Sequence, residues 1–232
     1  MNHEITHGPS FAMLRVDLQP GEIVQCEAGA MVARNSHLAM DVKMNTPRKG
    51  GFWGKFKGFF IAMIRKFIGG ETFFVNHFST PSQPGSVWFA PTLSGAITHR
   101  RLAGETITLS TGAYLASTGD IDMKLKFAGL KGLLAKEGLF FLEISGTGDL
   151  WFTSYGGVEA IPVNGTYMVD NGHIVGWEGP LTYTMKSVGG GAMGFFASGE
   201  GMVCEFQGQG RVYIQSRNLG ALVEWLTPLL PG

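Results

Sequence analysis

Charged residues and cysteines are scarce in this chain. Asp, Glu, Lys and Arg make up 16% of the 232 residues, against about 25% in an average protein, and the net charge is zero. A neutral chain lacks the basic surface that general nucleic-acid binding requires, so we expect no nucleic-acid partner. The two cysteines, Cys26 and Cys204, have no CxxC partner and no metal-ligand spacing. We therefore expect buried free thiols.

Motifs that carry catalysis are also missing. The six histidines do not pair with another His, Cys or Glu at the spacing of a zinc site, and no Gly-x-Ser-x-Gly motif occurs. The Gly-x-Gly pairs Gly146-Thr147-Gly148 and Gly208-Gln209-Gly210 are interpreted as turn glycines that connect one strand to the next. From these absences we expect a protein that is not an enzyme and that holds no cofactor and no metal.

What the chain does contain is a threefold repetition. A Gly turn, a loosely alternating strand, a second Gly turn and a short apolar strand recur at residues 18–33, 102–116 and 162–175. Each copy has a second half whose last strand is opened by a glycine, and these glycines are Gly85, Gly148 and Gly210. Their spacing gives a repeat of roughly 60 residues, which is typical of small β units.

The repetition predicts an all-β protein built from three similar antiparallel β modules in one compact unit. A repeat that cannot bury its own apolar face must pack on its neighbours, so the modules are expected to surround a pseudo-threefold axis. The expected bounds are about 10–90, 91–155 and 156–217, followed by a short C-terminal helix at 218–230. We expect this helix to cover a sheet edge or to meet another subunit. Because 44% of the chain is hydrophobic, we also expect a homo-oligomer.

The first module is interrupted by a predicted helical insertion at residues 50–69. Six cations and no acid lie between Arg48 and Ile68, so the rest of the chain carries 12 basic against 18 acidic residues. From Phe52 to Ile68 apolar residues recur every three or four positions, and most cations fall on the opposite side of a helix. A basic amphipathic helix with aromatic anchors is typical of a segment that lies in a lipid headgroup region. The residues expected to make contact are Trp53, Lys55, Phe56, Lys57, Phe60, Met63, Ile64, Arg65, Lys66 and Phe67.

Three roles are open for this segment. Its apolar face packs on the β core or a neighbouring subunit, contacts an anionic membrane surface, or enters a groove of a protein partner such as a membrane protein. It is not expected to span a bilayer, which takes about 20 mainly apolar residues. The chain starts without a basic region followed by an apolar run, so no signal peptide is predicted. The expected location is therefore cytoplasmic, with peripheral membrane contact as one alternative.

Short motifs along the chain resemble a known family. They are Phe89-Ala90-Pro91, Tyr114-Leu115-Ala116, Gly138-Leu139-Phe140, Gly146-Thr147-Gly148, Ser154-Tyr155-Gly156, Val169-Asp170-Asn171-Gly172-His173, Glu200-Gly201 and Gln215-Ser216-Arg217. In this order the chain resembles the AIM24 family, bacterial and archaeal proteins of unknown function similar to a fungal mitochondrial protein linked to inner-membrane organisation. The resemblance implies β-sandwich modules of the double-stranded β-helix type, related to the tryptophan RNA-binding attenuator protein (TRAP-like). It implies no enzyme activity and no catalytic residues.

Two functional hypotheses follow, from different classes. The first is a non-enzymatic oligomeric β scaffold that contacts a membrane surface or a membrane-associated partner through residues 52–68. The alternative is a small-molecule binding module that holds its ligand between β modules or subunits. A third hypothesis, an enzyme with cupin-like chemistry, would require a bound metal. The sequence leaves open the biological process and the number of subunits.

Overall fold

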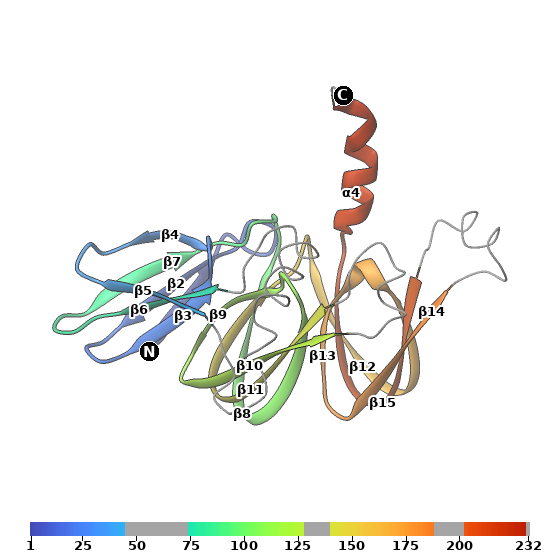
Figure 1. Ribbon diagram of the computed structural model, residues 1–232, viewed down its shortest axis with the longest axis horizontal. Helices are drawn as coiled ribbons and strands as arrows, with labels where there is room; N and C mark the ends of the chain where they lie inside the picture. Colours follow the sequence, from blue (N-terminus) through green and yellow to red (C-terminus); the bar gives the residue numbers. More distant parts are fainter. Residues whose placement is uncertain (45–73, 128–139, 188–201, 231–232) are drawn as a thin grey trace, which may run out of the picture.

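Antiparallel strands make up most of residues 1–44, 74–127, 140–187 and 202–230, which are the residues that the computed structural model describes (Figure 1). The first strand group consists of β1 (Asn2–Thr6), β2 (Met13–Leu18), β3 (Ile23–Glu27), β4 (Met31–Arg34), β5 (Ala39–Met44), β6 (Phe74–Ser79) and β7 (Gly85–Phe89). Burial alternates along β2, with Leu14, Val16 and Leu18 buried, as expected for a strand with one face on the core.

Two further groups follow, and each contains a long strand, a short strand, a strand of intermediate length and a second long strand. The second group has β8 (Ile97–Ser110), β9 (Tyr114–Thr118), β10 (Asp120–Phe127) and β11 (Phe140–Thr153). The third has β12 (Val158–Asp170), the short 3-10 helix η2 (Asn171–His173), β13 (Ile174–Glu178), β14 (Leu181–Ser187) and β15 (Met202–Gln215). The chain ends in α4 (Leu219–Leu226) and η3 (Thr227–Leu229), which confirms the predicted short C-terminal helix.

The strand pairings recur from group to group. In the second group β11 pairs with β8, β9 and β10, and in the third group β15 pairs with β12, β13 and β14. In the first group the two long strands are each divided. There β6 pairs with β5 and β3, and β7 pairs with β4 and β2. The β-rich fold predicted from the repeats is therefore confirmed.

Neighbouring groups are joined by one strand pairing each. The short strand β9 of the second group pairs with β3 of the first, and β13 of the third group pairs with β8 of the second. We call these two pairings the junctions. They connect strands from β12 to β5 into an 11-stranded sheet, beside a 4-stranded sheet of β1, β2, β7 and β4. In Figure 1 the three groups follow one another along the long axis of the molecule. The predicted pseudo-threefold axis and double-stranded β-helix are not confirmed.

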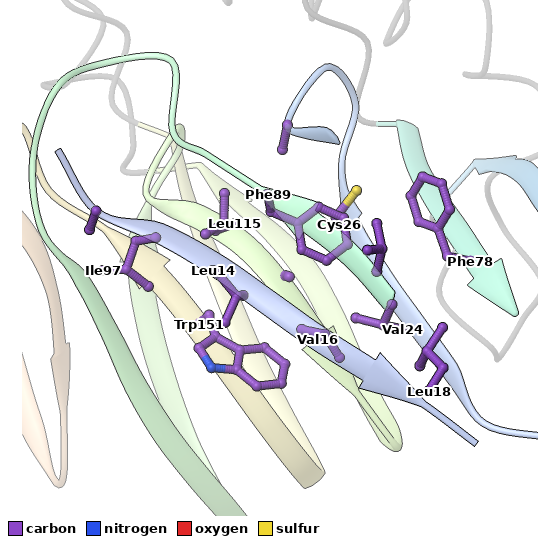
Figure 2. Close-up of a cluster of buried hydrophobic side chains, with 14 of the residues drawn as sticks. Leu14, Val16, Leu18, Val24, Cys26, Phe78, Phe89, Ile97, Leu115 and Trp151 are labelled. Carbon is purple, nitrogen blue, oxygen red and sulfur yellow. The ribbon is translucent and has the colours of Figure 1, made fainter. Parts of the chain in front are cut away.

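The first junction shares a hydrophobic core between two groups (Figure 2). Leu14, Val16 and Phe89 come from the first group, and Leu115 from β9 and Trp151 from β11 pack against them, all fully buried. Full burial of a side chain of this size contributes about 1.5–3 kcal/mol. The second group thus closes the core of the first, and the groups are not independent units.

One interpretation of the glycines is wrong. Gly148 and Gly210 do not lie in turns but inside the long strands β11 and β15. A Cβ at Gly148 would lie 2.0 Å from the Thr118 carbonyl oxygen, and one at Gly210 would lie 2.3 Å from the Glu178 carbonyl oxygen. Glycine is needed there because the end of the short strand passes directly over the long strand's backbone.

Candidate functional site

The ten residues from Trp53 to Phe67 that the sequence predicts to contact a membrane or partner lie outside the described residues. The structure does describe where their segment is attached. Met44 at the end of β5 and Phe74 at the start of β6 are register partners in one antiparallel hairpin. The two residues to which the segment is attached therefore lie side by side, at the loop end of this hairpin.

The first junction combines strand pairing with a buried polar contact. Gln25 on β3 lies opposite Ser117 on β9, and its Nε2 donates a hydrogen bond to Ser117 Oγ at 2.8 Å. The Tyr114 hydroxyl lies 3.0 Å from Ser117 Oγ and donates to the Gln25 carbonyl oxygen at 3.3 Å. Burial raises the pKa of Tyr114, so the hydroxyl keeps its proton and remains a donor.

The second junction is held by an ion-pair cluster around Glu178, the last residue of β13. Its Oε2 accepts from Arg100 Nη2 at 2.7 Å, across the boundary between the second and third groups. Its Oε1 accepts from Arg211 Nη1 at 3.0 Å and from the Tyr213 hydroxyl at 2.9 Å. Only 13% of the Glu178 side chain is exposed. A carboxylate at this depth requires such partners, because an unpaired buried charge is costly.

A second cluster surrounds Asp149 on β11. Its Oδ1 lies 2.9 Å from His99 Nε2, its Oδ2 accepts from Arg101 Nη1 at 2.6 Å, and its backbone amide donates to Thr118 Oγ1 at 3.1 Å. Partial burial raises the pKa of Asp149, but the hydrogen bond from His99 and the charge of Arg101 outweigh it and hold that pKa below its ordinary value. The centre of the His3 ring on β1 lies 4.3 Å from the centre of the His99 ring, so this cluster links the first group to the second.

The clusters occupy related places in the repeat. Asn35, Thr118 and Glu178 each stand at the end of a short strand or directly after it, and each bonds to the neighbouring long strand of its own group. The contacts are Asn35 Oδ1 with the Ser86 amide, Thr118 Oγ1 with the Asp149 amide, and Glu178 Oε1 with Arg211. We interpret these polar side chains as contacts between strands of one group rather than as reactive groups.

Sequence reasoning missed both clusters. Adjacent residues on a strand point to opposite faces, so a consecutive Arg100-Arg101 pair in a predicted strand indicates two separate partners. In the structure Arg100 binds Glu178 and Arg101 binds Asp149. The partners come from strands far along the chain, and the sequence offered no way to choose them among its other acids.

The described residues offer neither a metal site nor a reactive thiol. Among the described residues, no three His, Cys, Asp or Glu side chains come together in a group able to hold a metal ion. Cys26 and Cys204 are free and buried, as predicted. Burial raises the pKa of each thiol to about 12, so neither is a nucleophile near neutral pH.

The C-terminal helix projects from the body of the molecule (Figure 1). None of the residues of α4 or η3 is buried, and the exposed large side chains are Leu219, Val223, Trp225, Leu226, Leu229 and Leu230. The expectation that this helix covers a sheet edge is therefore not met within the described part of the chain. Within the same part, no helix has the length and apolar character needed to cross a lipid bilayer.

The chain has clear similarity to known proteins. Residues 3–217 match the family model described as "Mitochondrial biogenesis AIM24". An uncharacterised protein of Streptococcus pyogenes serotype M6 is 31% identical over 234 residues, a match that covers 100% of this chain and 92% of that protein. The X-ray structure of a Streptococcus pyogenes protein superimposes with a TM-score of 0.78 at 30% identity and covers 99% of each chain.

Proposed function

The chain belongs to the AIM24 family, and we propose that it acts as a non-enzymatic, oligomeric β scaffold that binds the surface of an anionic membrane through residues 52–68. The observation that carries this proposal is the place of that segment. It joins Met44 to Phe74, which are paired in register at the loop end of a hairpin. Because β5 and β6 pair with each other, the basic, apolar insertion occupies the connection between two strands and replaces neither of them.

The other two groups support the same interpretation. At its loop end, the hairpin of β10 and β11 has the pair Phe127 and Phe140, and that of β14 and β15 has the pair Ser187 and Met202. The connecting sequences contain Leu133-Leu134 and Phe195-Phe196, so the connection of each of the three hairpins contains apolar residues. The exposed apolar side chains of α4 add a further surface for lipid or for a membrane-associated partner.

The non-enzymatic part of the proposal rests on the roles of the polar residues that the structure describes. The carboxylates of Asp149 and Glu178 are already engaged by arginine and histidine side chains of neighbouring strands. Both clusters link strand groups, and this role explains their burial without any reaction.

Liposome flotation tests the membrane contact directly. The full-length protein is expected to float with vesicles containing anionic lipid and to remain unbound with neutral vesicles. Each Lys or Arg near an anionic surface contributes about 1 kcal/mol, so replacing Lys55, Lys57, Arg65 and Lys66 with Glu should weaken binding by about a thousandfold or more. Raising the salt concentration should weaken it as well, because exposed charges are screened.

The matched control keeps the charge and changes the residues. The variant Lys55→Arg, Lys57→Arg and Lys66→Arg should float like the wild type. Flotation that is the same on neutral and anionic vesicles, or that survives the change to Glu, would contradict the proposal. No flotation with either kind of vesicle would also contradict it, and would favour packing of this segment on protein.

A further inference from the structure

Each junction is made by the same two parts of the repeat. The short strand that follows the first long strand of a group supplies one side, and we call it the donor: β4, β9 and β13 in the three groups. The other side is the second half of a group's first long strand, which can pair with the donor of the next group. We call it the acceptor, and it is β3 in the first group, the end of β8 in the second and the end of β12 in the third. Inside the chain, β9 pairs with β3, and β13 pairs with β8. Among the described residues, the donor β4 and the acceptor in β12 pair only with strands of their own groups.

The unused donor exposes residues that are buried in the other two. Each donor has a β-bulge against its long strand, at Val32, Leu115 and Val175. Leu115 and Val175 are 0% and 1% exposed because they enter the core of the preceding group, whereas Val32 is 55% exposed. Three equivalent positions thus have two buried apolar side chains and one that is left in solvent.

The unused acceptor shows the complementary pattern. The strand registers place Val24, Ile107 and Tyr167 at equivalent positions, opposite Phe78, Ile144 and Phe206. Val24 and Ile107 are fully buried and pair with a residue of a donor strand, whereas Tyr167 is 39% exposed. Its neighbour Met168 is also exposed. This end of β12 is therefore an apolar sheet edge of the kind to which another strand adds.

The cores of the groups differ in the same way. The core of the first group is completed by Leu115 and Trp151 from the second, and that of the second group by Val175 and Tyr213 from the third. The core of the third group contains Trp177 and Phe206 and receives no donor within the described ranges. Its missing contribution corresponds to Val32 together with Trp88, the residue of β7 that stands where Trp151 and Tyr213 stand in their groups.

We infer that a second copy of this chain supplies the missing donor, so that β4 of one molecule pairs antiparallel with the end of β12 of another. In Figure 1 these two strands lie in the end groups of the molecule, with the second group between them, so one molecule does not join its own ends. We expect β4 to pair with β12 in the register that β9 has with β3 and that β13 has with β8. This register places Ala33 opposite Val169, Arg34 opposite Met168 and Asn35 opposite Tyr167. The inference rests on the oligomeric part of the proposed function and gives that oligomer its interface.

Such an interface is heterologous, because a donor meets an acceptor and not its own copy. A heterologous contact leaves one donor and one acceptor free in every open assembly, so addition continues until a ring closes or a filament forms. A symmetric dimer, in contrast, would use the same surface on both copies and would stop at two. This difference provides the test.

The experiment uses two full-length variants that each block one side. Val32→Lys places a charge where a donor enters a core, and Met168→Lys places one on the acceptor edge. Both residues are exposed in the single chain, so each variant should keep the wild-type melting temperature measured for dilute protein. Light scattering after size exclusion should show wild-type protein larger than a dimer and each variant alone as a monomer. The association of each variant should be weaker by about tenfold or more.

A mixture of the two variants should form a heterodimer and nothing larger, because only one intact donor and one intact acceptor meet. Monomeric wild-type protein at high concentration would overturn the inference. So would a variant that keeps the wild-type size, or a mixture that stays monomeric although both variants melt normally. If either lysine variant unfolds, Arg34→Glu and Tyr167→Glu replace them on the same two edges. Flotation of the monomeric variants separates this result from the membrane proposal, since their basic segment is intact.

Discussion

Gly176 offers the sharpest test of how the strand groups are joined. It lies in β13 opposite Leu109 of β8, at the second junction. A Cβ added to Gly176 would lie 2.4 Å from the Thr108 carbonyl oxygen and 2.7 Å from Leu109 Cδ2. Atoms do not approach this closely, so Gly176→Ala must push β13 away from β8 by roughly 1 Å.

Two opposing effects decide the size of the change. Extra atoms forced into a packed site cost about 1–3 kcal/mol, whereas Gly→Ala restricts the unfolded chain and stabilises by about 0.4–1 kcal/mol. The steric effect is larger, and the net loss should be about 1–2 kcal/mol. For a chain of this size that lowers the melting temperature by about 2–8 °C.

Differential scanning calorimetry of Gly176→Ala and Gly157→Ala gives the comparison. Gly157 is the matched control, because a Cβ there would meet only Ser216 Oγ at an ordinary 3.7 Å. We expect Gly157→Ala to melt at or slightly above the wild-type temperature. If Gly176→Ala also melts there, the close approach of β13 to β8 is not what joins the second and third groups.

Three further predictions concern individual side chains. In the native protein the thiols of Cys26 and Cys204 should react with a disulfide reagent far more slowly than in denaturant, because burial raises the pKa of each to about 12. Glu178→Gln leaves two arginines without their countercharge and should cost about 2 kcal/mol, measured as a melting temperature lower by about 4–8 °C. Burial and the neighbouring His99 lower the pKa of His3, so its contribution to stability is complete above pH 6.5 and is lost as the pH falls below that value. Melting curves at pH 7.5 and 5.5 should therefore differ more for the wild type than for His3→Asn, and equal differences would contradict the assignment.

Much of the fold was predictable because its pattern is local. The glycines at 85, 148 and 210 lie opposite Leu18, Leu102 and Val163, so the spacing read from the sequence marks the same place in each group. Alternating apolar residues gave the strands, and the spacing of Leu219, Val223 and Leu226 gave the C-terminal helix. Such features depend on residues that are near in sequence.

The junctions were not predictable, because they depend on which strands lie together across the chain. Nothing local distinguishes Val32 from Leu115 and Val175, although one is exposed and the others are buried. Likewise, the sequence does not distinguish a glycine inside a strand from a glycine in a turn. Glycine is required at position 148 because the Thr118 carbonyl oxygen packs against its backbone, a contact visible only in the structure. The predicted contact residues between Trp53 and Phe67 lie outside the described residues, and their role stays a prediction.

The most direct test of this account is a cross-link between two copies. Arg34→Cys on β4 and Met168→Cys on β12 would face each other across the inferred pairing. Gln25 and Ser117 face each other in the same way within the chain, with Gln25 Nε2 2.8 Å from Ser117 Oγ. Mixing the two single variants under mild oxidation should give a disulfide-linked dimer, since the natural thiols are buried. Each variant alone should give almost none. No cross-link in the mixture, or equal cross-linking of one variant with itself, would contradict assembly of the scaffold from β4 to β12.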